Sequence, residues 1–203
     1  MNHDAAGSGV TGQEHSMDER LIGRARELLK EHITADNLRK HCLATEAIMR
    51  ALAPRFDADP DLWGTAGLLH DLDYDETKDN MARHGEVTAG ILREEGYPEE
   101  MIEAIRSHNA DNLGMERTKP FGIALAAAES ATGLIAAMAL ILPSKKIADV
   151  KTKSVVKRMK EVGFARNVDR EDIRRAEEIG LEVREFLDIG VQAMKDAAAD
   201  LGL

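Results

Sequence analysis

The residues best suited to chemistry in this sequence are four histidines and two carboxylates. They are His41, His70, Asp71, His84, His108 and Glu129. Imidazole nitrogens and carboxylate oxygens suit zinc, iron, manganese and similar ions. His70 and Asp71 are adjacent in an expected turn, so both can bind one ion. The carboxylate of Asp71 can also bridge to a second ion. A single histidine on an apolar face is more often a satisfied core residue, but the six together favour a metal site.

Helices must position these residues, because the sequence contains no strand pattern of useful length. Apolar spacing predicts helices at about 18–33, 36–52, 61–70, 80–95, 98–108 and 120–142, with the second capped by Asp36 or Asn37. We expect an acidic loop at 73–79, another loop at 111–118, and two more helices after residue 147. His41 shares a buried stripe with Leu38 and Thr45, and His84 shares a helix face with Met81. Glu129 lies on the long Ala-rich helix.

Composition agrees with an all-α, single-domain helical bundle. The chain has 203 residues, and only 3% of them are aromatic while Ala and Leu are abundant, which favours helix over sheet. Residues 1–16 are polar and rich in Gly, and we expect a disordered extension there. The helical domain then covers residues 17–203, with a metal-site core at about 36–133 and C-terminal helices at 147–203.

The net charge of −10 argues against a coat of nucleic acid or an anionic membrane surface as a partner. The stretch from Phe121 to Leu142 is long enough to span a bilayer, but Glu129 inside it would be costly there. We therefore expect a core helix and no membrane. Cys42 is the only cysteine, which suits a reducing cytoplasm. It adjoins His41 on one helix, where neighbours face apart, so it is not counted as a ligand. The sequence leaves a homodimer open.

A family resemblance rests on the same residues. The run from Trp63 to Tyr74, WGTAGLLHDLDY, resembles the signature of the HD superfamily of metal-dependent phosphohydrolases, in which an apolar helix ends in His-Asp. His41 matches the first histidine of the family. The segments Arg83-His84-Gly85 and Ser107-His108-Asn109 match the extra histidines of its two-metal members. The resemblance runs from about Asp36 to Gly133, and more weakly to the C-terminus as in small stand-alone bacterial and archaeal HD proteins.

The resemblance implies one or two divalent ions of Mn, Fe, Co, Ni or Zn. One ion would be held by His41, His70, Asp71 and Glu129, and Asp71 would bridge to a second ion held by His84 and His108. The family usually has Asp where this chain has Glu129, whose longer side chain leaves either an altered catalytic site or a degraded one. The implied activity is hydrolysis of a nucleotide or related phosphate ester or anhydride by metal-activated water, with Asp71 and Lys78 as catalytic residues.

A phosphate substrate needs local positive charge in so acidic a protein. The only basic concentration follows the Ala-rich helix, and we expect Lys145 and Lys146 there, with Arg166 further on, to bind the substrate. The alternative is a solvated helix face. Two other functions stay open: a di-iron oxygenase of the HD type, which uses the same ligand set, and a non-catalytic metal-binding sensor or scaffold.

Overall fold

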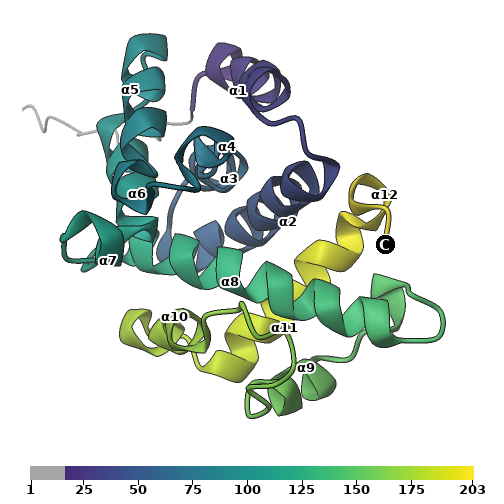
Figure 1. The fold of residues 1–203 in the computed structure, drawn as a ribbon. Helices are drawn as coiled ribbons and strands as arrows, with labels where there is room; N and C mark the ends of the chain where they lie inside the picture. The colour runs from purple at the N-terminus through teal and green to yellow at the C-terminus, as the bar shows by residue number, and fades with distance from the viewer. Residues whose placement is uncertain (1–16) are drawn as a thin grey trace, which may run out of the picture.

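The computed structural model describes residues 17–203, and this part of the chain contains helices and no β-strand (Figure 1). The predicted all-α fold is confirmed; the expected N-terminal extension, residues 1–16, lies outside the described residues. The α-helices in chain order are α1 (Glu19–His32), α2 (Asp36–Leu52), α3 (Pro60–Leu69), α4 (Tyr74–Thr77), α5 (Glu86–Glu95), α6 (Glu99–His108), α7 (Ala110–Leu113), α8 (Pro120–Ile141), α9 (Thr152–Arg158), α10 (Arg170–Arg174), α11 (Val183–Asp196) and α12 (Ala198–Leu201). Short 3-10 helices lie at Ala53–Phe56, Met81–Arg83, Ile147–Asp149 and Arg175–Ile179.

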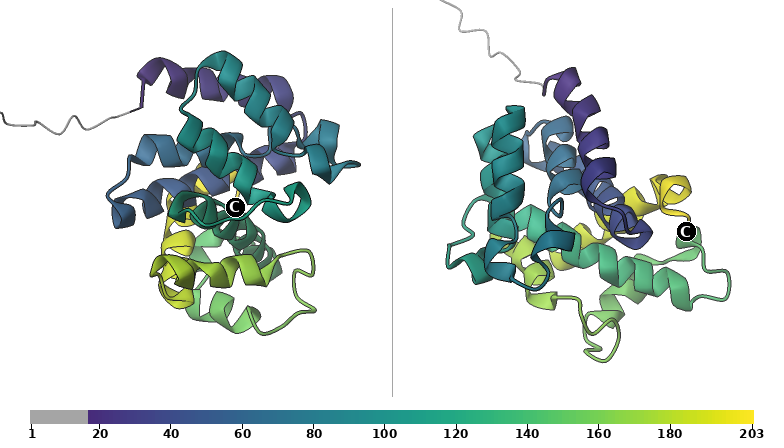
Figure 2. Two further views of the ribbon diagram at one scale, coloured as in Figure 1. Left: turned by 90° about the vertical axis from the view of Figure 1, so that its left-hand side faces the viewer. Right: turned by 45° about the horizontal axis from the view of Figure 1, so that its top comes forward.

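Helix α8 lies between two groups of helices and packs against both. Helices α2, α3 and α6 pack on it from one part of the chain, and α9, α10 and α11 pack on it from the other (Figures 1 and 2). It is long and apolar enough to cross a membrane by length and composition alone, but 67% of its most apolar window is buried within the molecule. Such burial is what the core helix of an all-α fold requires.

Two glycines let α2 and α3 approach closely. A Cβ built on Gly67 would lie 2.8 Å from the backbone carbonyl of Thr45, and one on Gly64 would collide with the side chain of Arg50. A larger residue at Gly67 would push the two helices apart, and one at Gly64 would displace the side chain of Arg50. The close contact places His41, on α2, beside His70, at the end of α3.

Several predicted boundaries are wrong, and the most important is the helix expected at 80–95. The chain forms a 3-10 turn at Met81–Arg83, His84 is extended, and Gly85 has φ +86°, so α5 begins only at Glu86. A left-handed glycine interrupts a helix because only glycine adopts that conformation without strain. His84 therefore lies in the turn before α5.

Other differences are smaller. Helix α2 begins at Asp36 with Ala35 as its N-cap, so the cap expected at Asp36 or Asn37 is wrong. The predicted acidic loop at 73–79 contains α4, and the loop at 111–118 begins within α7. Helices α9, α10, α11 and α12 replace the two helices expected after residue 147. These segments are four to fourteen residues long, and the shorter ones span too few turns to show a helical period.

Candidate metal centre

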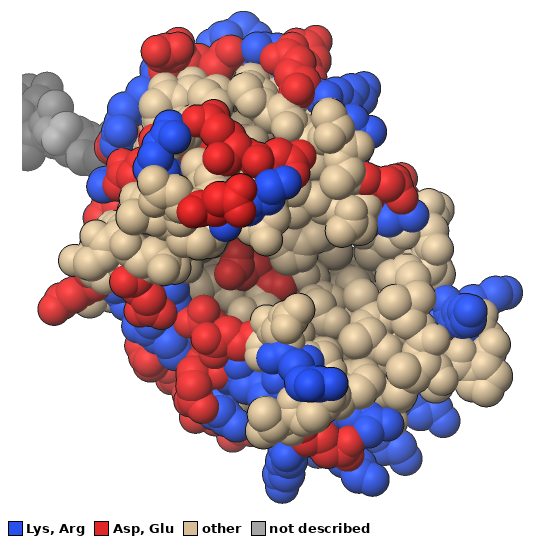
Figure 3. Space-filling view, in the orientation of Figure 1, with Lys and Arg blue, Asp and Glu red and all other residues tan. Residues whose placement is uncertain are grey.

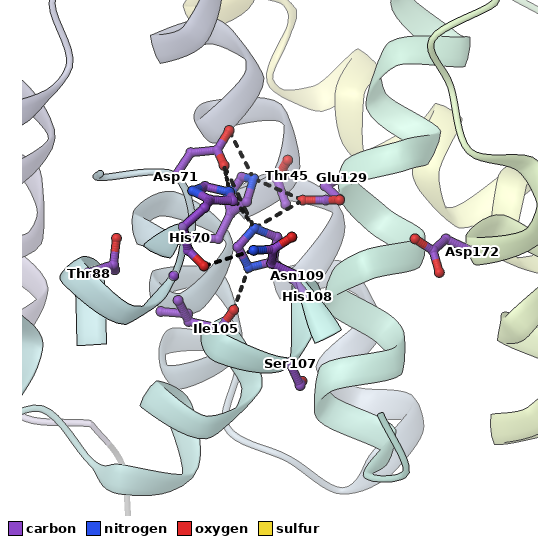
Figure 4. Close-up of polar contacts among 12 residues, drawn as sticks. Thr45, His70, Asp71, Thr88, Ile105, Ser107, His108, Asn109, Glu129 and Asp172 are labelled. Carbon is purple, nitrogen blue, oxygen red and sulfur yellow. Dashed lines mark hydrogen bonds and ion pairs between the residues drawn. The ribbon is translucent and has the colours of Figure 1, made fainter. Parts of the chain in front are cut away.

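Four imidazole rings point their Nε2 atoms into one buried space. His41 Nε2 lies 3.2 Å from His70 Nε2, and His84 Nε2 lies 2.9 Å from His108 Nε2. The rings come from distant parts of the chain: α2, the end of α3, the turn before α5, and the end of α6. Figure 4 shows His70 and His108 facing each other, with Asp71 and Glu129 beside them.

Asp71 stands between the two histidine pairs and turns one oxygen toward each. Its Oδ2 is 3.7 Å from His41 Nε2 and 3.5 Å from His70 Nε2. Its Oδ1 is 3.3 Å from His84 Nε2 and 3.9 Å from His108 Nε2. The cluster thus divides into two groups of three possible ligands that share Asp71.

Two of the histidines are oriented by the helices that they end. His70 Nδ1 donates to the Gly67 carbonyl at 2.8 Å, and His108 Nδ1 donates to the Ile105 carbonyl. A carbonyl oxygen can only accept, so Nδ1 carries the hydrogen in both rings and the Nε2 lone pair faces the cluster. This is the arrangement in which a second partner fixes a ligating histidine.

His84 is oriented by Asp73, a residue that sequence reasoning assigned to a loop. Asp73 Oδ1 accepts from His84 Nδ1 at 2.7 Å, and its Oδ2 accepts from the backbone of Gly85 and Thr88, both at 2.9 Å. The carboxylate therefore caps the N-terminus of α5 and holds the histidine that precedes this helix. The hydrogen bond from His84 keeps the pKa of the Asp73 carboxyl below its usual value, against the effect of burial.

His41 is oriented from α8. Its Nδ1 lies 2.8 Å from Thr132 Oγ1, and that hydroxyl donates to the Glu129 carbonyl at 2.6 Å. With its hydrogen used in this way, the hydroxyl accepts from the imidazole, so the lone pair of His41 also lies on Nε2. Thr132 lies three residues after Glu129, on the same helix face. This spacing is the sequence feature from which its position beside the cluster could have been predicted.

Asn109 fixes the turn that carries His84 against the end of α6. Its side-chain amide donates to the carbonyl of Met81 at 2.7 Å and to that of His84 at 2.9 Å. The turn before α5 and the end of α6 are therefore tied together beside His108. Asn109 belongs to the sequence motif Ser107-His108-Asn109, but this motif alone does not indicate its role.

Glu129 reaches the cluster from α8. Its Oε2 is 3.4 Å from His70 Nε2 and 3.8 Å from His108 Nε2, so it borders a member of each histidine pair. Burial and the neighbouring Asp71 carboxylate raise the pKa of Glu129 well above its usual value. Asp172, on α10, faces Glu129 across a gap in Figure 4 and adds to this effect.

Burial also decides the charge of the histidines. It lowers the pKa of His41 to about 4 and that of His108 to about 3. His84 is different: burial opposes its protonation, but hydrogen bonds to Asp71 and Asp73 raise its pKa to about 10. The histidines that stay neutral near pH 7 are already in the form that binds metal.

The donor set fits divalent transition metals. Two nitrogens that each lie about 2.1 Å from one ion at a right angle are about 3 Å apart, and the two Nε2 pairs have this spacing. Each pair is completed by a carboxylate oxygen of Asp71. Without a cation, four imidazoles and two carboxylates buried together would have no evident reason to converge.

The structure does not bring the other predicted residues to this cluster. Lys145 and Lys146 are exposed beyond the end of α8, and the helix rises about 18 Å over the twelve steps from Glu129 to Ile141 alone. Arg166 is exposed between α9 and α10. Lys78 is exposed at the end of α4, next to Thr77, whose hydroxyl lies 3.3 Å from His84 Nδ1. Lys78 therefore directly follows a residue that contacts the cluster, whereas Lys145, Lys146 and Arg166 do not.

Comparison with known families agrees with this geometry. The HD domain family matches residues 38–150, which is more than half of the chain and includes all six residues of the cluster. The chain therefore belongs to the HD domain family, whose members are typically metal-dependent phosphohydrolases. No solved structure matches the chain at a significant level.

Proposed function

We propose that this protein is a metal-dependent phosphohydrolase that uses water to cleave a phosphate ester or anhydride. The observation that carries the proposal is Asp71, which places one carboxylate oxygen next to each of two histidine pairs. That arrangement suits two ions close together, as in enzymes that activate water for in-line attack on phosphorus. Nucleotide-like phosphates are the first substrates to test, because the family resemblance favours them.

Each residue of the cluster has a defined task in this proposal. His41, His70 and Asp71 would hold one ion, His84, His108 and Asp71 the other, and Glu129 borders both sets. When bound, such ions polarise a phosphoryl oxygen and lower the pKa of water. The Nδ1 hydrogen bonds keep the rings from rotating, so the donors are in place before substrate arrives.

The single thiol of the sequence is unsuited to a competing covalent mechanism. Cys42, the only thiol in the sequence, is buried, and burial raises its pKa well above the usual value. A thiol nucleophile must be deprotonated, so this side chain is unsuited to attack. Water is the remaining nucleophile.

The test combines metal analysis with a substrate panel. Protein purified without chelator is analysed for bound metal, then stripped and reloaded with Mn, Fe, Co, Ni or Zn. Phosphate release is measured on nucleotides, simple phosphomonoesters and phosphodiesters. Asp71→Ala should abolish hydrolysis and lower metal content, whereas Asp75→Ala, an exposed carboxylate on α4, should leave both unchanged.

Two outcomes would contradict the proposal. Bound iron with a mixed-valence EPR signal and substrate-dependent oxygen uptake would assign the cluster to a di-iron oxygenase. Stoichiometric metal with no turnover on any member of the panel would favour a sensor or scaffold.

A further inference from the structure

A cavity of about 440 Å³ adjoins the cluster of histidines and carboxylates along the crossing of α2 and α8. Its apolar wall is made by Ala44, Ala136, Leu140, Met194 and Leu201. The volume lies within the range of small-molecule sites, which are mostly apolar with a few polar groups. In the space-filling view the surface is hollowed at its centre, with acidic atoms deep inside and largely uncharged surface beside them (Figure 3).

The cavity and the cluster share residues. His41 and Thr132, which are hydrogen-bonded to each other, line the cavity at the end nearest the cluster. On α8, Thr132, Ala136 and Leu140 follow one another at intervals of four, so they form a single stripe that leads away from Glu129. A molecule bound at the cluster could therefore extend along this stripe.

Exposure indicates the side from which the cluster is reached. The side chain of His41 keeps 28% of its surface exposed, whereas those of His70, His84 and His108 keep 0%, 4% and 2%. His41 is also the only one of the four histidines among the residues that line the cavity. The cavity thus meets the cluster at its most exposed histidine, His41.

The lining carries one cation and no acidic side chain, although the protein as a whole is strongly acidic. Lys40 Nζ pairs with Asp36 at 2.9 Å, and 42% and 79% of these two side chains are exposed. An exposed pair of this kind contributes little stability, so the ammonium can turn to an anionic ligand at small cost. The cavity therefore combines an apolar wall with a movable positive charge.

We propose that the substrate is a phosphate ester of an apolar alcohol, with its phosphate at the metal cluster and its hydrocarbon part in the cavity along α8. This inference rests on the proposed hydrolase function and narrows its substrate class. It also assigns the cationic role expected of Lys145 and Lys146 to Lys40. A nucleoside would place a polar base and ribose against a wall of Ala, Leu and Met, where few of their hydrogen-bonding groups would find partners.

Binding of n-alkylphosphonates tests the inference without requiring turnover. Calorimetry on the metal-loaded protein, with chains of two, four, six and eight carbons, should show affinity rising about threefold to fourfold per methylene until the cavity is filled. The heat-capacity change should become more negative along the series, as expected when apolar surface is buried. Affinity that does not change with chain length would overturn the inference.

Matched variants locate the effect. Ala136→Leu should flatten the dependence on chain length, whereas Ala137→Leu, its neighbour on α8 outside the cavity lining, should preserve it. Lys40→Gln should weaken all four phosphonates by a similar factor, and Lys30→Gln, on exposed α1 surface, should have no effect. An unchanged slope in Ala136→Leu would place the hydrocarbon elsewhere and contradict the proposal.

Hydrolysis of the corresponding n-alkyl phosphates separates this inference from the proposed function. Binding that depends on chain length, with no phosphate release under any metal, would reject the hydrolase but support the apolar site. Release from nucleoside monophosphates, together with uniform binding of the phosphonates, would support the hydrolase and reject the apolar substrate. Faster release from octyl than from ethyl phosphate, lost in Ala136→Leu, would support both.

Discussion

Each histidine of the cluster uses its two ring nitrogens for different purposes. One nitrogen donates to a carbonyl, a carboxylate or a hydroxyl, and the other faces the shared space. A ring held in this way loses little freedom when it binds an ion, since its orientation is already fixed. The second partners are therefore as much part of the site as the ligands.

The first prediction concerns Glu129. Glu129→Ala should lower bound metal, because the carboxylate borders one histidine of each pair. Glu129→Asp should retain metal, since the shorter side chain keeps the charge and is the ligand usual in the family. Metal is counted by elemental analysis after dialysis, with Glu116→Ala as the exposed control. Wild-type metal content in Glu129→Ala would remove this residue from the site.

The second prediction concerns stability and pH in the absence of metal. Burial holds the pKa values of His41 and His108 near 4 and 3, below the value of about 6.5 in an unfolded chain. At these two histidines the unfolded chain therefore binds more protons between pH 6.5 and 4, which lowers the free energy of unfolding as the pH falls. Glu129, whose pKa is raised in the folded chain, has the opposite effect and offsets part of this slope. The slope is up to about 1.4 kcal/mol per pH unit for each histidine. His84, whose pKa is raised to about 10, acts in the opposite direction near pH 6.5 and above, and adds little slope below about pH 6, where it is protonated in both states.

Urea unfolding of chelator-treated protein at pH 6, 5.5 and 5 measures this slope. His41→Gln should reduce it, because glutamine does not titrate. His32→Gln, at an exposed position on α1, should not change it. Equal stability at all three pH values would show that the cluster opens to water in the metal-free protein.

At the residue scale the sequence indicated the six residues that the fold brings together, but it did not indicate the residues that orient the histidines. The donor types and their order were readable, but Asp73 looked like one more acid in an acidic loop. Its role depends on the start of α5 lying beside Asp73, a contact between segments that no local pattern reveals. Lys145 and Lys146 show the opposite error. They follow the helix of Glu129 in sequence, yet the length of that helix carries them away from the cluster.

At the scale of elements, the approach of α2 to α3 decides whether the first histidine pair exists. Gly67 contributes twice: it lacks a side chain where Thr45 passes, and its carbonyl accepts from His70. The interface thus sets both the distance between the two rings and the orientation of one of them.

The third prediction follows from this contact. Gly67→Ala should destabilise the protein by about 1–3 kcal/mol, because the new methyl group meets backbone that cannot move aside. It should also weaken metal binding by separating His41 from His70. Gly90→Ala is the matched control, since a Cβ there meets nothing and the change should stabilise α5 by up to about 1 kcal/mol. Denaturant unfolding with and without metal measures both effects, and equal stability of the two variants would contradict the prediction.

Helix prediction succeeded where the apolar stripe was long and failed where a single residue redirected the chain. The stripe through His41 predicted α2 to within a residue at its start. Met81, Val87 and Ile91 also fit one helical face with His84, but Gly85 interrupts that helix. A glycine inside an apolar pattern is compatible with either outcome, and here the capping of α5 by Asp73 decides it.

At the scale of the whole molecule, the cluster joins segments that are otherwise far apart in sequence. Its ligands come from α2, α3, the turn before α5, α6 and α8, so they converge only in the folded chain. An ion that binds this set binds the native state and leaves the unfolded chain largely without it.

The fourth prediction is a dependence of stability on metal. An ion present at one hundred times its dissociation constant should add about 2.7 kcal/mol. That corresponds to a rise in Tm of roughly 5–10 °C for a chain of this size. Differential scanning calorimetry with added Mn²⁺ measures the shift. Asp71→Ala should abolish it, whereas a shift of equal size in that variant would assign the effect to metal bound elsewhere.

The place of α8 between two groups of helices has a consequence for biosynthesis. During translation α8 leaves the ribosome after the helices that cover one of its sides, but α11, which covers another, begins about forty residues later. At typical elongation rates the apolar face of α8 that packs against α11 therefore stays exposed for about 2–8 s before α11 is synthesised. A nascent chain in this condition is a natural client of chaperones, and translation arrested between α8 and α11 should release an aggregation-prone product.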